Sequence, residues 1–168
     1  IVLLLHYITP VHYRNAMLLV VNLIFYGWKK PAYLFIMFAS IGIDYVHGLL
    51  VEKAKAQGND RRARRYVAQS VIFNLALLGF FKYWDFIARS LAAVGLGFMP
   101  VLGLELPIGI SFYTFQTMSY TIDVYRGDAK AQRSMVNFGT FVTLFPQLIA
   151  GPILKYKDLA DQIDQRDY

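Results

Sequence analysis

A stretch of 19 mostly apolar residues, Tyr33–Val51, constrains the fold of this chain more than any other part of its sequence. A helix of about 20 apolar residues is long enough to cross the hydrocarbon layer of a bilayer. Further apolar blocks lie at residues 15–28, 67–84, 107–125 and 135–149. Because a helix satisfies its backbone hydrogen bonds internally, it suits such blocks in lipid. We therefore predict an all-α fold, a polytopic transmembrane helical bundle in which residues 1–168 form one membrane domain.

The composition agrees with a membrane protein. The chain is 57% hydrophobic, and its mean hydropathy is +0.40. It has no cysteine, which excludes disulfides, thiolate nucleophiles and cysteine metal sites. The signatures of common soluble enzymes, such as GxSxG, the P-loop and HExxH, are missing as well. We expect no metal site and no bound cofactor.

Most of the positive charge lies between Glu52 and Tyr66, where six Lys or Arg residues face two acids. Segments rich in Lys and Arg stay on the cytoplasmic side of the membrane. The sequence therefore predicts a cytoplasmic basic loop at residues 52–66, in contact with anionic lipid headgroups. No aromatic platform or groove-reading motif accompanies these charges, so nucleic acid is not an expected partner.

Both ends of the sequence interrupt a structural pattern. Ile1 stands inside an apolar run, and Tyr168 ends a polar, helix-like stretch. We expect a piece of a longer membrane protein. Residues 153–167 place apolar side chains at helical spacing, and we predict an amphipathic interfacial helix there. Its apolar face comprises Tyr156, Leu159, Ala160 and Ile163.

The segment Leu106–Gly127 is apolar overall but carries many polar side chains. At 100° per residue they sort into faces of a helix. One face is a stripe of hydroxyls, which we expect to bond to their own backbone or to a neighbouring helix. A second face combines aromatic and amide groups, for which helix packing and a cavity wall are both open. The hydroxyl stripe consists of Ser111, Thr114, Thr117 and Thr121, and the second face of Gly109, Tyr113, Gln116 and Tyr120.

Ionisable and helix-breaking residues give further candidates. Asp44 and His47 share a face, so a proton relay or an acid orienting a base is one interpretation, and a structural hydrogen bond is the simpler one. Asp123 and Arg126 can pair across one turn, or Arg126 can bind an acidic ligand. In FPQLIAGP, residues 145–152, a proline inside an apolar helix frees backbone groups for packing or for a cavity. We also expect Asn74 to form an interhelical hydrogen bond.

The motifs LPIGISFYTFQ…YTIDVYRG and FPQLIAGPI resemble those of the membrane-bound O-acyltransferases, in particular the members that O-acetylate alginate. The resemblance implies a multi-pass enzyme of the bacterial cytoplasmic membrane. Such an enzyme acetylates an extracytoplasmic polysaccharide, such as alginate or peptidoglycan, together with a secreted or membrane-anchored acetyltransferase partner. The acyl donor, acetyl-CoA or an acyl carrier thioester, is a substrate rather than a bound cofactor.

In that family the hallmark histidine lies in a later membrane segment, so the resemblance assigns no catalytic residue to this chain. We expect an N-terminal fragment that is inactive by itself and supplies part of a substrate cavity. Its implied substrate-binding residues are Tyr113, Gln116, Gln147 and Gly151 in the wall, with Asp123 and Arg126 at the rim. The alternative is a non-enzymatic membrane protein, either part of a proton-coupled transporter or an assembly scaffold.

Overall fold

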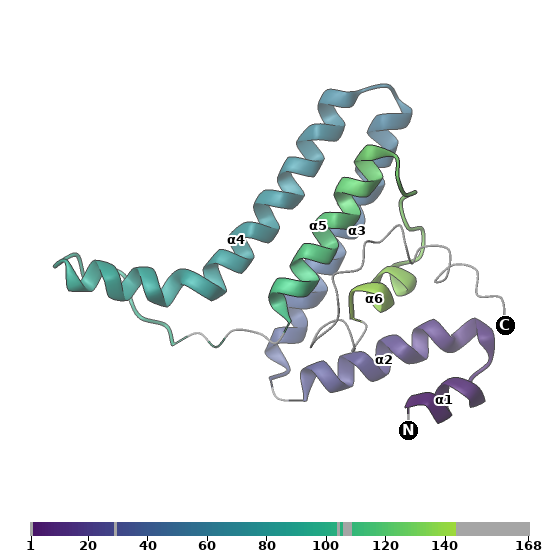
Figure 1. Ribbon diagram of the computed structural model, residues 1–168, viewed down its shortest axis with the longest axis horizontal. Coiled ribbons are helices and arrows are strands. Elements are labelled where there is room, and N and C mark those ends of the chain that lie inside the picture. The colour runs from purple at the N-terminus through teal and green to yellow at the C-terminus, as the bar shows by residue number, and fades with distance from the viewer. Residues whose placement is uncertain (1, 29, 104, 106–108, 144–168) are drawn as a thin grey trace.

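The computed structural model describes residues 2–28, 30–103, 105 and 109–143, and every regular element in these ranges is a helix. Three long helices, α3, α4 and α5, pack along one another, while α2 lies across the base of α3 and packs on α6 (Figure 1). The predicted helical class is therefore confirmed for the described residues. The helices are α1 (Val2–Ile8), α2 (Arg14–Gly27), α3 (Ala32–Ala56), α4 (Asp60–Ala93), α5 (Ile110–Arg126) and α6 (Met135–Thr143), with a short 3₁₀ helix at Val11–Tyr13.

Two of the described helices, α3 and α4, are long and apolar enough to cross a membrane. Only 33% of the apolar stretch of α3 and 11% of that of α4 is buried. The side chains of Phe35 and Ile72 are 78% and 67% exposed. A core helix of a soluble protein buries most of its apolar surface, whereas such extended apolar exposure suits contact with lipid.

Helix α4 is too long for a simple crossing. Its 34 residues rise about 50 Å, against a hydrocarbon layer of about 30 Å. Figure 1 shows that α4 bends and that its distal part turns away from α3 and α5. The helix continues without a break past the interfacial aromatic Trp84 to Ala93, and irregular chain follows it. Two side chains of α4 then hold the chain that follows the helix. The Trp84 indole donates to the Pro100 carbonyl oxygen at 3.1 Å, and the Asp85 carboxylate accepts from the Leu102 amide at 2.8 Å.

The basic segment is helical over most of its length, so the predicted loop at residues 52–66 is wrong in extent. Helix α3 continues to Ala56 and α4 begins at Asp60, which leaves a short turn at residues 57–59. Lys, Arg, Ala and Glu are strong helix formers and prolong both helices. Asn59 caps α4, because its side chain accepts a hydrogen bond from the Arg62 amide at 3.1 Å.

Helix α5 contains most of the motif that the sequence singles out, and its end is set by a glycine. Gly127 has a φ of +81°, in the left-handed region that only glycine adopts without strain. The Asp123 carbonyl accepts hydrogen bonds from the amides of Gly127 and Asp128, the latter at 3.0 Å. The sequence DVYRG thus stops the helix and turns the chain toward α6.

Helices α3 and α5 approach each other most closely at Gly48 and Tyr120. A Cβ atom on Gly48 would lie 2.5 Å from both the Cε1 and the hydroxyl oxygen of Tyr120. The Tyr120 ring also packs on Phe138 of α6, with 4.5 Å between ring centroids. Its hydroxyl accepts a hydrogen bond from the Gln132 amide at 3.0 Å. One side chain thus fixes the spacing of three elements.

The connection between α5 and α6 is tied to the basic end of α3 by Glu52. The two oxygens of this carboxylate accept from the Ala131 amide, at 3.1 Å, and from the Arg133 guanidinium. The Tyr45 hydroxyl donates to the Arg133 carbonyl oxygen at 2.8 Å. Side-chain and backbone contacts therefore hold residues 131–133 in one conformation.

Removing the Glu52 carboxylate is expected to loosen this connection without unfolding the bundle. Glu52→Ala leaves the Ala131 amide without its acceptor, a loss of about 1–3 kcal/mol of local stability. Amide hydrogen exchange at residues 130–133 should then become about tenfold faster or more. Glu52→Gln retains an acceptor oxygen and is the matched control. Unchanged exchange in Glu52→Ala would show that the carboxylate does not anchor the connection.

Candidate functional site

A buried polar cluster joins the three long helices, with the carboxylate of Asp44 on α3 at its centre. Ser70 and Asn74, both on α4, donate to its two oxygens at 2.5 Å (Ser70 Oγ to Oδ1) and 2.7 Å (Asn74 Nδ2 to Oδ2). All three side chains are fully buried. The expected interhelical hydrogen bond of Asn74 is therefore confirmed, and its partner is Asp44.

The cluster extends to α5 through its hydroxyl stripe. The Asn74 carbonyl oxygen accepts from Ser40 of α3 (3.1 Å) and from Thr117 of α5 (3.4 Å). Ser70 lies 3.3 Å from the Thr121 hydroxyl oxygen. Thr117 and Thr121 also bond to backbone carbonyls of α5, at 3.0 and 3.2 Å. The structural interpretation of the stripe is thus confirmed for these two threonines.

The arrangement favours a structural role for Asp44 over an acid–base pair with His47. The Nδ1 atom of His47 lies 2.7 Å from the Ile43 carbonyl oxygen, and its ring packs edge-on against Tyr66. Both carboxylate oxygens of Asp44 are meanwhile engaged by α4. A fully satisfied buried network fixes the relative positions of its helices, because any slip leaves polar groups without partners.

A sequence signal for this cluster exists, although only parts of it were recognised. Each of the three helices contributes two polar residues four positions apart, which places the pair on one helical face. Asp44, Asn74 and the threonines were noticed separately, while Ser40 and Ser70 were missed. The pairs are Ser40 and Asp44 on α3, Ser70 and Asn74 on α4, and Thr117 and Thr121 on α5.

The second face of α5 lies beside the hydroxyl stripe and contacts α2 and α6, while its Tyr120 also contacts α3. The Tyr113 ring packs edge-on against Tyr26 of α2, with 6.4 Å between centroids. Gln116 is 2% exposed, and Tyr120 fills the space beside Gly48. Helix packing is therefore the role of Tyr120. Tyr113 and Gln116 face the protein interior, and the cavity-wall hypothesis for them stays a prediction.

The remaining predicted site residues lie in different settings. Asp123 is buried at the end of α5, whereas Arg126 is exposed. Between them in sequence, Tyr125 bonds to Arg64 (3.0 Å) and Asp60 (3.1 Å) at the start of α4. Gln147 and Gly151, the FPQLIAGP motif and the predicted interfacial helix at 153–167 lie outside the described residues.

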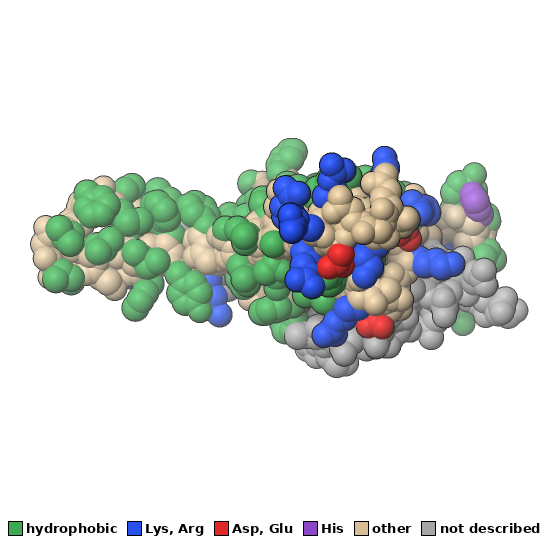
Figure 2. Space-filling model, turned by 90° about the horizontal axis from the view of Figure 1, so that it is seen from above, with side chains coloured by type: hydrophobic (Ala, Val, Ile, Leu, Met, Phe, Trp, Pro, Cys, Tyr) green, Lys and Arg blue, Asp and Glu red, His purple; other side chains and the backbone are tan. Residues whose placement is uncertain are grey.

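Positive charge gathers at the end of the bundle where α3, α4 and α5 meet, as Figure 2 shows from above. The adjoining ends of α3 and α4 supply part of it, and the end of α5 with its following connection supplies the rest. The sequence alone placed the charge in one loop, and the fold adds cations from more than sixty residues later. The exposed cations are Lys53, Lys55, Arg61, Arg62, Arg64, Arg65, Arg126, Lys130 and Arg133.

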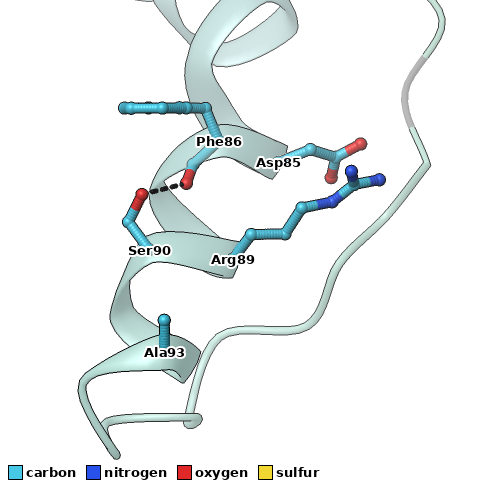
Figure 3. A pocket seen from close by; sticks show the side chains of 5 residues that line it. All are labelled: Asp85, Phe86, Arg89, Ser90 and Ala93. Carbon is cyan, nitrogen blue, oxygen red and sulfur yellow. Dashed lines mark hydrogen bonds between the residues drawn. The ribbon is translucent and has the colours of Figure 1, made fainter.

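A pocket of about 480 Å³ lies on the distal part of α4 (Figure 3). It is lined by Asp85, Phe86, Arg89, Ser90 and Ala93. The side chains of Asp85 and Arg89 extend on the same side of the helix, and the Ser90 hydroxyl donates to the Phe86 carbonyl at 2.8 Å. The lining comes from a single stretch of helix and includes none of the predicted site residues. Among the described residues, no three His, Cys, Asp or Glu side chains gather as metal ligands would.

Comparison with known proteins gives close relatives in sequence. The chain is 42% identical to the probable alginate O-acetylase AlgI of Azotobacter vinelandii and 41% identical to that of Pseudomonas aeruginosa, over 98% of its length in both cases. It is 28% identical to a peptidoglycan O-acetyltransferase of Helicobacter pylori over 89% of its length. No family model and no solved structure matches.

The chain spans about a third of the length of each of these relatives: 33% of the Azotobacter protein and 32% of the other two. The aligned region covers almost the whole chain, so it includes the apolar blocks outside the two motifs as well as the motifs themselves. The resemblance inferred from the motifs is thereby confirmed. Over 98% of its length, this chain is therefore a homologue of part of the alginate O-acetylases.

Proposed function

We propose that this chain is part of a membrane-bound O-acetyltransferase that transfers acetyl groups to hydroxyls of an extracytoplasmic polysaccharide such as alginate or peptidoglycan. The observation that carries the proposal is the 41–42% identity to alginate O-acetylases across 98% of the chain. The peptidoglycan O-acetyltransferase relative widens the acceptor class to a second cell-envelope polymer. The whole protein lies in the bacterial cytoplasmic membrane as a multi-pass enzyme.

In this proposal Tyr113 and Gln116 form part of the cavity wall. Both side chains are buried, and the Thr114 hydroxyl beside Tyr113 has no hydrogen-bond partner among the described residues. A buried polar group without a partner costs about 1–3 kcal/mol, which a polar ligand can offset. Gln147 and Gly151 complete the wall, and Asp123 and Arg126 lie at its rim.

The proposed chemistry is acyl transfer from a thioester, either acetyl-CoA or an acyl carrier. Amide and phenol donors in a cavity with little water stabilise the negative oxygen that develops as the acceptor hydroxyl attacks. Removing the proton from that hydroxyl requires a general base. By the family resemblance this base is a histidine outside the present chain, so the 168-residue chain alone is expected to be inactive. A secreted or membrane-anchored acetyltransferase partner completes the transfer outside the membrane.

The buried cluster around Asp44 supports this function indirectly. It locks α5 against α3 and α4 through the threonine face, so the adjacent face of α5, with Tyr113 and Gln116, is held at a fixed position. A site built on rigid helices keeps its donors within the small tolerance that catalysis requires.

The test is O-acetylation by the full-length protein in an alginate-producing bacterium that lacks its own alginate O-acetylase. We expect acetyl signals on secreted alginate, or on isolated peptidoglycan, in proton NMR spectra. Gln116→Ala should lower acetylation by about tenfold to a hundredfold, because it removes a proposed oxyanion donor. Phe115→Ala is the matched control, because the Phe115 side chain, next to Gln116 in sequence, is 43% exposed and faces outward.

Three results would each contradict a part of the proposal. Wild-type protein that is inserted in the membrane but acetylates neither polymer would favour a transporter part or an assembly scaffold. Full acetylation by Gln116→Ala would leave the enzyme assignment standing but remove Gln116 from the cavity wall. Acetyl transfer by the purified 168-residue chain would show that a base lies within it.

A further inference from the structure

A groove of about 440 Å³ opens at the basic end of α3, apart from the proposed cavity wall. Its floor is apolar, and its rim carries two cations, Lys53 from α3 and Arg133 from the connection between α5 and α6. The groove exists because Glu52 holds that connection against α3. The lining residues are Leu49, Leu50, Glu52, Lys53, Ala56 and Arg133.

The apolar floor continues down the outer face of α3. Val46, Leu50 and Lys53 stand at i, i+4 and i+7, so they form one stripe along the helix. Val46 is 49% exposed and lies one turn below the groove. The stripe is apolar toward the middle of the helix and cationic at its end. An amphiphile with an anionic head and a hydrocarbon tail has the same order of groups.

The charge in the groove also favours an anion. Two cations face one carboxylate, and that carboxylate is already engaged by Arg133 and by the Ala131 amide. Arg133 keeps further N–H donors, since its side chain is 75% exposed. Lys130 lies nearby in the same connection and adds to the positive field. Basic pockets at the cytoplasmic ends of membrane helices bind anionic lipid headgroups in this way.

We propose that this groove binds one anionic glycerophospholipid, with its phosphate between Lys53 and Arg133 and one acyl chain along Leu50 and Val46. A soluble phosphate compound would leave the exposed apolar stripe of α3 uncovered. A zwitterionic lipid would cover the stripe but bring no net negative charge to the two cations. The proposal does not depend on the acetyltransferase activity.

The experiment measures lipid binding next to the groove by fluorescence quenching. The full-length protein is given a single tryptophan near the groove, by Val46→Trp with all native tryptophans changed to Phe, including Trp28 and Trp84. It is reconstituted in vesicles containing dibrominated phosphatidylglycerol or dibrominated phosphatidylcholine. Each cation near the membrane surface contributes about 1 kcal/mol to the binding of an anionic lipid. We therefore expect phosphatidylglycerol to bind at least about fivefold more tightly than phosphatidylcholine.

Three single substitutions distinguish a specific lipid site in the groove from general attraction of anionic lipids by the surface charge. Lys53→Gln should remove most of the preference for phosphatidylglycerol. Arg61→Gln removes the same charge at the same end but outside the groove, and it should leave most of the preference in place. Glu52→Gln removes the only acid in the lining while keeping an acceptor for the Ala131 amide, so it should raise the preference.

The outcomes that overturn the proposal are equally specific. Equal quenching by the two lipids, or an equal loss in Arg61→Gln and Lys53→Gln, would mean that no lipid site exists. Displacement of the bromolipid by millimolar coenzyme A or sodium phosphate would assign the groove to a soluble phosphate compound. Native mass spectrometry of the protein without the tryptophan changes, with phosphatidylglycerol added to detergent, applies the same comparison if the reporter variant does not fold.

Discussion

Asp44→Ala is expected to lower the free energy of unfolding by about 2–4 kcal/mol, because it leaves two buried donors of α4 without an acceptor. Hydrogen bonds between membrane helices are worth less on average, about 0.6 kcal/mol each, when the partners find substitutes. Ser70 and Asn74 are fully buried, so water cannot replace the carboxylate. The measurement is the thermal unfolding midpoint of the full-length protein in detergent.

Asp44→Asn is the matched control for this prediction. Its carbonyl oxygen can still accept from Asn74, and its amide can donate to Ser70, whose own proton then turns to Thr121 at 3.3 Å. We expect a shift less than half that of Asp44→Ala. The effects of Asp44→Ala and Asn74→Ala should also fail to add, since both break the same bond. Strict additivity, or equal shifts for the two Asp44 variants, would show that the network does not hold the helices.

Gly48→Ala is expected to disrupt the packing of α3 on α5 and to cost about 2–3 kcal/mol. The new Cβ atom would stand 2.5 Å from the Tyr120 ring, and that side chain cannot swing away. It is fully buried, packs on Phe138 and accepts from the Gln132 amide. The clash should outweigh the gain of about 1 kcal/mol that alanine brings to a helix interior.

Gly42→Ala provides the control on the same helix. Its added Cβ would meet only the Met135 Cε at 3.8 Å, an ordinary contact, so helix propensity should dominate and stability should rise slightly. In a Tyr120→Ala background, Gly48→Ala should lose most of its effect, because the clashing ring is gone. Thermal unfolding midpoints of the wild type, Gly48→Ala, Tyr120→Ala and the double variant form a double-mutant cycle. A midpoint for Gly48→Ala equal to that of Gly42→Ala would contradict the close approach.

The patterns of the sequence predicted the helices well where apolar residues dominate. The stretch 33–51 and the motif segment appear as α3 and α5, because length and periodicity decide whether an apolar block forms a helix. The predicted helix boundaries were wrong where charged residues follow an apolar block. Their charge suggested a loop for residues 52–66, but Lys and Arg are strong helix formers. Lys53 and Lys55 therefore lie in the extended end of α3, and Arg61 lies in the first turn of α4.

The candidate site was less accessible to sequence reasoning, because its members lie far apart in the chain. Asp44 next to His47 suggested a local pair, yet the carboxylate bonds to Ser70 and Asn74, on the next helix. No periodicity within α3 reports which residues of α4 face it. The rotation of one helix against another is fixed only when all their polar and apolar side chains pack together.

By itself, the sequence determined the helical class, the apolar lengths that suit a membrane, the excess of cations and the family, since these depend on residue types and on order along the chain. Only the tertiary structure decided that Asp44 is held by α4, that Gly48 admits Tyr120, and that Lys53 shares a groove with Arg133. These are contacts between helices. Their geometry follows from the packing of the whole bundle, which no local pattern records.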